Sequence, residues 1–242
     1  MFKRFIKKII FSILDTPIGK SIVLQYAKTQ PSLAIRAVQK SLDLDDLDPA
    51  SLPSHLNGFE DLYFLFNCNN SNRLVAQLDL NEAGHLFSVA KSIPNGRLLE
   101  VGRFGGGSAV LLATAVNGAE GRLFSIDISD IEDKVIKEFL ERYGLASRVD
   151  LVVADSRTYK VKPESLDFIF IDGDHSYEGV KADFYNFRDA LKVGGHMLFH
   201  DYYPWIGVVR FLDEMKENER SFFALERIVG TLAHFKKIKS TS

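Results

Sequence analysis

Cysteine is almost absent from this chain of 242 residues, which contains only Cys68. A single cysteine excludes an internal disulfide and any zinc site built on several cysteines. It is consistent with a reducing compartment, and we expect a cytoplasmic protein. An excess of either charge is missing too, because 30 basic and 32 acidic residues leave a formal net charge of −2. That balance is not typical of nucleic-acid-binding proteins, so we expect no nucleic-acid partner.

Long hydrophobic runs are also missing, and no segment reaches the roughly 20 apolar residues that span a bilayer. The basic N-terminal residues precede an apolar segment, residues 9–14, that is short for a signal peptide. No small-residue cleavage site follows this segment, and we therefore expect it to be uncleaved.

Basic charge is instead concentrated in the first 40 residues, which contain eight lysine or arginine residues and one acidic residue. Apolar residues recur there at helical spacing opposite the basic ones, which predicts an amphipathic basic helix. We expect residues 1–57 to form a helical basic extension and residues 58–242 to form the main domain. Residues 1–15 have two interpretations. They form either a helix that packs on the core or builds a homo-oligomer, or a peripheral contact with the inner face of a membrane.

The chain after residue 96 alternates between short apolar runs and helical patterns. The expected strands are residues 97–102, 122–127, 149–154, 168–172 and 196–200, and the expected helices are residues 106–116, 131–143, 177–191 and 206–216. This alternation is typical of a parallel sheet with helices on both faces. Two further strands, residues 222–228 and 231–235, are so close in sequence that they predict an antiparallel hairpin. The expected fold class is α/β, with a Rossmann-like seven-stranded sheet that is mostly parallel and has an antiparallel C-terminal hairpin strand.

A glycine-rich turn follows the first expected strand. Gly102 and Gly106 allow the backbone to approach a ligand, and a helix begins directly after the turn. The dinucleotide fingerprint Gly-x-Gly-x-x-Gly fails here, because Phe104 occupies the position of the second glycine. With the acid Glu100 before the turn, the pattern favours a nucleoside cofactor of the S-adenosylmethionine type over a dinucleotide.

Acidic residues end the next two expected strands. Asp127 can accept hydrogen bonds from both hydroxyls of a ribose, as acids at this position do in nucleotide-binding sheets. Asp155 can accept a hydrogen bond from the exocyclic amine of adenine. Either residue can instead cap a following helix.

The fourth and fifth expected strands end in a dense set of ionisable residues. Asp172, Asp174 and His175 follow the fourth strand, and His200 and Asp201 follow the fifth. Because ligands bind outside the carboxyl ends of parallel strands, these side chains collect where chemistry is expected. An isolated histidine is usually packed or solvated, but two histidines and three aspartates at adjacent strand ends indicate a site. Residues 202–205, three of which are aromatic, either form a wall for an acceptor or anchor the loop in the core.

Together these segments resemble the class I S-adenosylmethionine-dependent methyltransferases, and more closely the bacterial macrolide and sugar O-methyltransferases. In that subgroup the first motif reads Glu-x-Gly-x-Phe-x-Gly-x-Ser, matched by Glu100, Gly102, Phe104, Gly106 and Ser108. The fourth strand ends Ile-Asp-Gly-Asp-His-x-Tyr, as residues 171–177 do. The fifth ends Gly-Gly-x-x-x-Phe-His-Asp-Tyr, as residues 194–202 do. The resemblance covers residues 80–238.

The resemblance implies a role for each of these residues. The implied cofactor-binding residues are Glu100, Gly102, Phe104, Gly106, Ser108, Asp127, Asp155, Ser156 and Asp172, and the implied catalytic residues are Asp172, His175 and His200. Metal-dependent relatives bind a divalent cation such as Mg²⁺ or Mn²⁺, and the corresponding residues here are Asp172, His200 and Asp201. His200 departs from the family pattern, which usually has a carboxylate there. A histidine ligand suits manganese, iron or zinc better than magnesium.

The expected function is therefore O-methylation of a small hydroxylated acceptor, such as a sugar, a glycolipid or a natural product. The acceptor hydroxyl needs a metal that lowers its pKa or a base that removes its proton, and His175 or His200 is the candidate base. Two other classes of protein stay open at this point. One is a non-catalytic module that binds S-adenosylmethionine or docks on a membrane, and the other is a cephalosporin-hydroxylase-like oxidoreductase of the same overall fold.

Overall fold

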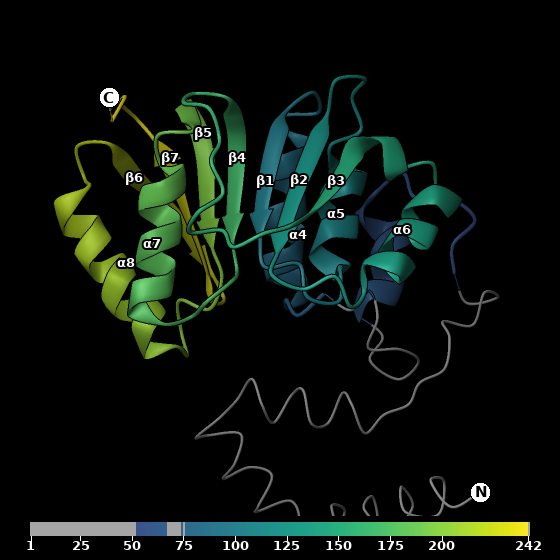
Figure 1. Cartoon of the computed structure of the whole chain (residues 1–242), viewed down its shortest axis with the longest axis horizontal. Coiled ribbons are helices and arrows are strands. Elements are labelled where there is room, and N and C mark those ends of the chain that lie inside the picture. Colours follow the sequence, from purple (N-terminus) through teal and green to yellow (C-terminus); the bar gives the residue numbers. More distant parts are fainter. Residues whose placement is uncertain (1–51, 67–73, 75, 242) are drawn as a thin grey trace, which may run out of the picture. The chain divides into compact units, whose positions relative to one another are not determined.

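The computed structural model describes residues 52–66, 74 and 76–241 (Figure 1). The expected amphipathic helix and the two interpretations of residues 1–15 lie outside the described residues. The domain boundary expected after residue 57 stays a prediction. Within the described part of the chain, no helix combines the length and the hydropathy needed to cross a membrane.

A seven-stranded sheet forms the centre of the described residues. Its strands are β1 (Arg97–Val101), β2 (Arg122–Asp127), β3 (Val149–Val153), β4 (Leu166–Ile171), β5 (Leu191–Phe199), β6 (Phe223–Val229) and β7 (Leu232–Lys237). They lie in the order β3-β2-β1-β4-β5-β7-β6. Strands β1 to β5 pair in parallel, whereas β7 is antiparallel to both of its neighbours. The expected Rossmann-like sheet with an antiparallel C-terminal hairpin strand is confirmed.

Helices cover both faces of this sheet. They are the 3₁₀ helices η2 (Phe59–Phe66) and η3 (Ala146–Arg148) and the α-helices α4 (Leu80–Lys91), α5 (Gly107–Ala115), α6 (Asp133–Arg142), α7 (Tyr177–Phe187) and α8 (Ile206–Asn218). Figure 1 shows α7 and α8 in front of the sheet and α4 and α5 behind it. Because strands between two helical layers are buried on both faces, their sequences are continuously apolar rather than alternating.

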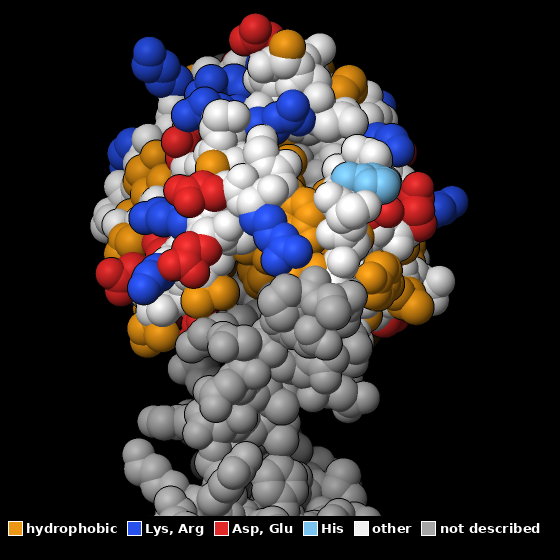
Figure 2. Space-filling model, turned by 90° about the vertical axis from the view of Figure 1, so that its right-hand side faces the viewer, with side chains coloured by type: hydrophobic (Ala, Val, Ile, Leu, Met, Phe, Trp, Pro, Cys, Tyr) orange, Lys and Arg blue, Asp and Glu red, His pale blue; other side chains and the backbone are white. Residues whose placement is uncertain are grey.

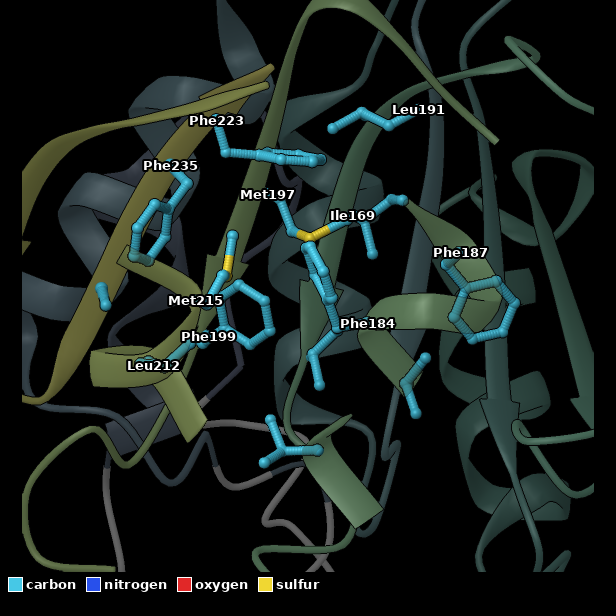
Figure 3. Close-up of a cluster of buried hydrophobic side chains, with 14 of the residues drawn as sticks. Ile169, Phe184, Phe187, Leu191, Met197, Phe199, Leu212, Met215, Phe223 and Phe235 are labelled. Carbon is cyan, nitrogen blue, oxygen red and sulfur yellow. The ribbon is translucent and has the colours of Figure 1, made fainter. Parts of the chain in front are cut away.

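The core between β4, β5 and the α7–α8 pair is rich in aromatic side chains (Figure 3). Phe184 of α7 lies at its centre, with ring centroids 5.5 Å from Phe211, 5.3 Å from Phe223 and 6.4 Å from Phe199. Fully buried rings of this size contribute several kcal/mol each through removal of apolar surface from water. The ends of β4 and β5 therefore project from a rigid base.

Two boundaries differ by several residues from those expected, and the other boundaries differ by two residues at most. Helix α7 ends at Phe187 rather than at residue 191, and β5 begins at Leu191 rather than at residue 196. The reason is a bulge: Leu191 pairs with Leu166, and the register then shifts before Phe168 pairs with His196. The glycines at 194 and 195 lie inside this bulge, where the left-handed φ of Gly194 is easily adopted.

Candidate functional site

The glycine-rich turn after β1 lies directly against the end of β4. Gly102 has a φ of +91°, and a Cβ atom there would overlap the carbonyl oxygen of Asp172. Gly106, with a φ of +83°, precedes α5, and a Cβ atom there would lie 2.6 Å from the Cδ1 atom of Ile136. Both glycines are required by backbone conformation and close packing together. The turn is thus held between β4 and α6.

Asp127, at the end of β2, is bonded to the backbone of this turn. Its Oδ2 atom accepts hydrogen bonds from the backbone N–H groups of Arg103 and Phe104, both at 2.9 Å. Its Oδ1 atom accepts one from the N–H of Ser129 at 2.9 Å. The same carboxylate keeps lone pairs for a further donor, since two carboxylate oxygens offer about four acceptor positions.

Arg103 is a residue of the turn that the sequence patterns did not identify. Its side chain is buried and pairs with Asp133 of α6 at 2.7 Å. The guanidinium also donates to the carbonyl oxygen of Ser125 on β2. No sequence pattern predicts this burial, because a basic residue between a glycine and a phenylalanine in a turn is typical of an exposed position. Arg103 fastens the turn to β2 and α6.

Glu100 lies beneath the turn and is fully buried, with 0% exposure. Its Oε2 atom accepts a hydrogen bond from the hydroxyl of Ser125, and Ser108 donates to the same carboxyl. Among the described residues its Oε1 atom has no partner. Burial raises the pKa of Glu100 to about 7, against the opposing effect of the two serine hydrogen bonds. Glu100 therefore supports the turn from below.

Asp155 and Ser156 follow β3 and have different partners. The Asp155 carboxylate forms a two-pronged hydrogen bond with Arg157, whose Nε and Nη2 atoms lie at 2.9 and 2.7 Å. The side-chain hydrogen bond of Arg157 lowers the pKa of Asp155 to about 2. The hydroxyl of Ser156 donates instead to Asp183 of α7 at 2.6 Å. Asp155 caps no helix, because the chain continues in turns to β4.

Four ionisable side chains meet at the ends of β4 and β5, and we call this group the histidine end of the site: Asp172, His175, His200 and Asp201. His175 donates from Nε2 to Asp201 at 2.9 Å and lies 3.4 Å from Asp172. His200 approaches the same oxygen of Asp172 with Nδ1 at 3.2 Å. We call a second group, which surrounds the glycine turn, the glycine-loop end of the site. It consists of residues 100–108, 127, 155 and 156.

The two histidines of the histidine end hold positive charge. Burial disfavours the imidazolium of His175, but hydrogen bonds and charges from Asp172 and Asp201 outweigh burial and raise its pKa to about 9. Burial acts likewise on His200, yet Asp172 and Glu82 raise its pKa to about 10. With pKa values above 7, both imidazoles are therefore protonated on both nitrogens, and so cationic, at neutral pH when no cation is bound.

Asp201 of the histidine end is held in an unusual backbone conformation. Asp201 has a φ of +60°, a left-handed conformation that costs a residue other than glycine roughly 1–2 kcal/mol. The next residue holds it there: the N–H of Tyr202 donates to the carbonyl of Thr231 at 2.9 Å, and its hydroxyl donates to Asp213 at 2.6 Å. The segment after β5 is thereby anchored in the core at Tyr202.

Trp205, just before α8, packs on His175 of the histidine end. Its ring stacks on that of His175, with centroids 4.9 Å apart and planes 13° from parallel. The contact is possible because Gly207, at the start of α8, lets the helix approach the backbone of residues 175–177. An aromatic face beside an imidazolium favours the charged form and limits ring rotation.

Glu82 is the second residue that sequence patterns missed. It lies in the first turn of α4, is 4% exposed, and its Oε2 atom lies 3.4 Å from Nε2 of His200. It also accepts from the hydroxyl of Thr231 at 2.8 Å and from the backbone of Asp79, which completes a capping box. The capping pattern in the sequence indicates only a helix start. Contact with His200 depends on the tertiary fold.

The histidine end offers atoms suited to a divalent cation. Ligand atoms of Asp172, His175 and Asp201 all lie within 4.8 Å of one another. The sequence-based metal set contained His200 in place of His175. His200 has Nδ1 toward Asp172 and Nε2 toward Glu82, which is the arrangement of a metal-binding histidine oriented by a carboxylate behind it. Two carboxylates with imidazole nitrogen favour Mn²⁺ or Fe²⁺ over Mg²⁺.

The surface beside β3 and α6 is mixed in charge. Figure 2 shows basic, acidic and hydrophobic side chains interspersed on this face, and α6 itself contributes Lys134, Lys137, Glu138, Glu141 and Arg142.

Comparison with known proteins is consistent with this geometry. Residues 99–202 match the family model of a methyltransferase domain. An S-adenosylmethionine-dependent O-methyltransferase from Thermotoga maritima is 18% identical, with a TM-score of 0.53 over 68% of each chain. A Bacillus cereus O-methyltransferase in complex with S-adenosylhomocysteine is 18% identical, with a TM-score of 0.51 over 95% of this chain and 97% of that one. An S-adenosylhomocysteine-bound methyltransferase from Podospora anserina is 16% identical, with a TM-score of 0.53 over 65% and 78%.

These likenesses to solved structures establish the fold alone. The match to a methyltransferase domain on residues 99–202 includes the glycine turn and the ends of β4 and β5.

Proposed function

We propose that this enzyme transfers the methyl group of S-adenosylmethionine to an oxygen atom of a small hydroxylated acceptor, such as a sugar, a glycolipid or a natural product. The observation that carries the proposal is the convergence of Asp172, His175, His200 and Asp201 beside the glycine turn. Gly102 packs against the backbone of Asp172, so the two ends of the site are in direct contact. A methyl donor at one end and an acceptor at the other would therefore be neighbours.

The glycine-loop end is suited to the nucleoside. Asp127 lies beside the turn with acceptor capacity left for ribose hydroxyls, and the N-terminus of α5 opens toward the turn. Glu100 is fully buried, so in this proposal it stabilises the turn and the ligand meets the residues above it. When bound, S-adenosylmethionine supplies an electrophilic methyl group, and the protein aligns the acceptor with it.

The histidine end is suited to a hydroxyl acceptor. Asp201 and Asp172 orient the imidazole of His175, as a carboxylate orients the base in other acid–base pairs. A proton on His175 must leave before this ring can accept one from the acceptor. A divalent cation held by Asp172 and Asp201 would compete with that proton and lower the pKa of the acceptor hydroxyl. We therefore include Mn²⁺ or Fe²⁺, bound through Asp172, Asp201 and an imidazole, in the proposal.

The same observation argues against a non-catalytic module. A protein that only binds the cofactor has no need for a buried histidine and a half-buried histidine between three carboxylates, because bringing charges out of water is costly even when they are paired. The oxidoreductase alternative has no specific support, and the relatives described above are methyltransferases.

The test is transfer of a labelled methyl group from S-adenosylmethionine to a panel of free sugars, sugar nucleotides, glycolipids and phenolic compounds. We expect an O-methyl ether in the product, identified by mass spectrometry and NMR, and loss of transfer in Asp201→Asn. Activity should fall after EDTA treatment and return more fully with Mn²⁺ than with Mg²⁺. Methylation at nitrogen or carbon would contradict the proposal. Cofactor binding without transfer to any acceptor would favour the non-catalytic alternative.

A further inference from the structure

Asp183 is a buried acid that the proposed reaction does not use. It lies on the inner face of α7, is 1% exposed, and accepts the hydrogen bond of the Ser156 hydroxyl at 2.6 Å. Burial raises the pKa of Asp183 to about 6, and the charges of Asp174 and Asp155 act in the same direction. At pH 7.5 the side chain is therefore an ionised carboxylate, which can only accept hydrogen bonds.

This hydrogen bond decides what the hydroxyl of Ser156 can offer to a ligand. A serine hydroxyl has one proton to donate and two lone pairs that accept. Since the proton points to Asp183, the oxygen of Ser156 presents only lone pairs to any other group. A rotation that turned the proton outward would leave a buried carboxylate without its donor, which costs free energy.

The loop that carries Ser156 is also fixed by a second residue of α7. The amide of Asn186 donates to the backbone carbonyl of Ser156 at 2.6 Å and to that of Tyr159 at 2.7 Å. Asn186 thus holds the position of the loop, whereas Asp183 controls the direction of the hydroxyl. The two contacts can be separated by mutation.

Ser156 is placed where the base of a nucleoside would lie. Strands β1, β2 and β3 are consecutive in the sheet, and neighbouring strands are about 4.8 Å apart. If the ribose is held by Asp127 at the end of β2, the base extends toward the end of β3. Asp155, the other candidate there, already has its carboxylate engaged by Arg157. The oxygen of Ser156 is then the freer acceptor.

We propose that Asp183 is a positioning residue that makes the Ser156 oxygen an acceptor for the exocyclic amine of adenine, and so selects 6-aminopurine over 6-oxopurine nucleosides. This proposal rests on the proposed function, because it assumes a nucleoside cofactor at the glycine-loop end. An oxygen that presents only lone pairs attracts an amine and repels a carbonyl oxygen. Selectivity therefore arises from the direction of one proton.

The test is calorimetric titration at pH 7.5 with S-adenosylhomocysteine and with its analogue that carries hypoxanthine in place of adenine. We expect the wild type to bind the adenine compound at least about tenfold more tightly, as a mismatched hydrogen bond implies. Asp183→Ala and Ser156→Ala should each reduce this ratio to below about threefold. The double variant should lose no more selectivity than either single variant, because both act through the same hydroxyl.

Asn186→Ala is the matched control, since it removes the other contact between α7 and the same loop. It should weaken both ligands equally and keep the ratio. Equal weakening of both ligands by Asp183→Ala, with the ratio kept, would overturn the proposal and leave Asp183 a structural residue. Equal binding of both ligands by the wild type would overturn it as well, while the proposed function would stand. If the wild type binds neither compound, both the proposed function and this inference fail. Asp183→Leu, which is similar in size but has no acceptor for the Ser156 hydroxyl, repeats the measurement if the alanine variant does not fold.

Discussion

At the glycine-loop end Asp127 binds backbone N–H groups, whereas at the histidine end the ionisable side chains bind one another. Asp127 contacts three backbone N–H groups, all within 24 positions of it in the chain. At the histidine end, His175, His200 and their carboxylates contact one another across β4, β5 and α4. At the glycine-loop end, backbone donors fix the position of the Asp127 carboxylate. At the histidine end, the ionisable groups interact, so the net charge of the site can change with pH.

Each end also contains one buried glutamate, Glu100 at the glycine-loop end and Glu82 beside the histidine end. The pKa values of these two residues are shifted in opposite directions. Glu100 lies under the glycine loop with one oxygen that lacks a partner among the described residues, and burial raises its pKa to about 7. Glu82 lies under the histidine end. Burial also opposes its ionisation, but hydrogen bonds from His200, Thr231 and Asp79 outweigh burial and lower its pKa to about 2. The pKa values of these two buried carboxyl groups are thus shifted in opposite directions, because the number of hydrogen-bond donors differs.

The largest expected effect concerns the contact between the two ends. Gly102→Ala should destabilise the fold by roughly 2–6 kcal/mol, because a left-handed φ and an overlap with the Asp172 carbonyl add together. Urea unfolding followed by circular dichroism measures this change. Gly144→Ala is the matched control, since Gly144 has a φ of +67° and open space around its Cα. It should cost only about 1–2 kcal/mol. Similar losses of unfolding free energy in both variants would show that the glycine-loop end is not closely packed against the histidine end at Gly102.

The next effect tests the histidine end through Glu82. Its carboxyl has a lowered pKa, so it stabilises the fold above the unfolded pKa of about 4.5, and this contribution is lost as pH falls toward 2. Glu82→Gln should therefore reduce the free energy of unfolding by roughly 2–3 kcal/mol at pH 7 and by less at pH 3. Urea titrations at the two pH values measure the difference. The exposed Glu120 provides the control, and Glu120→Gln should change neither value.

The smallest of the three stability effects tests the glycine-loop end through Glu100. Its raised pKa means that the folded protein keeps a proton which the unfolded chain releases, so stability falls as pH rises from about 4.5 to about 7. Glu100→Gln should remove roughly 2 kcal/mol of this decline between pH 5 and pH 8. Melting temperatures at both pH values provide the readout. A decline as steep in the variant as in the wild type would show that Glu100 is ionised throughout.

The sequence predicted the sheet and its hairpin because both follow from local patterns. Apolar strands, the glycine turn and the Gly230 turn each act over a few residues, and their consequences are confirmed in the strand order. The bulge in β5 was not predicted, because Gly194 and Gly195 have the same signature as a turn before a strand. Pairing of β5 with β4 decides between a turn before the strand and a bulge inside it.

The candidate site was predictable to the extent that it lies at strand ends. Asp127, Asp172, His200 and Asp201 each follow a strand, and parallel strands bring their ends to one edge. Glu82, Arg103 and Asp183 were missed because their partners are far away in sequence. Glu82 meets His200 across 118 positions of the chain, and only the folded structure creates that contact.

The central claim is that the glycine-loop end binds the cofactor and the histidine end does not. Calorimetric titration of S-adenosylhomocysteine into the wild type, Asp127→Ala and Asp201→Asn tests it most directly. We predict one binding site in the wild type, binding weakened by at least about 30-fold in Asp127→Ala, and a change of less than about threefold in Asp201→Asn. Absence of binding to the wild type, or a larger loss in Asp201→Asn than in Asp127→Ala, would contradict it.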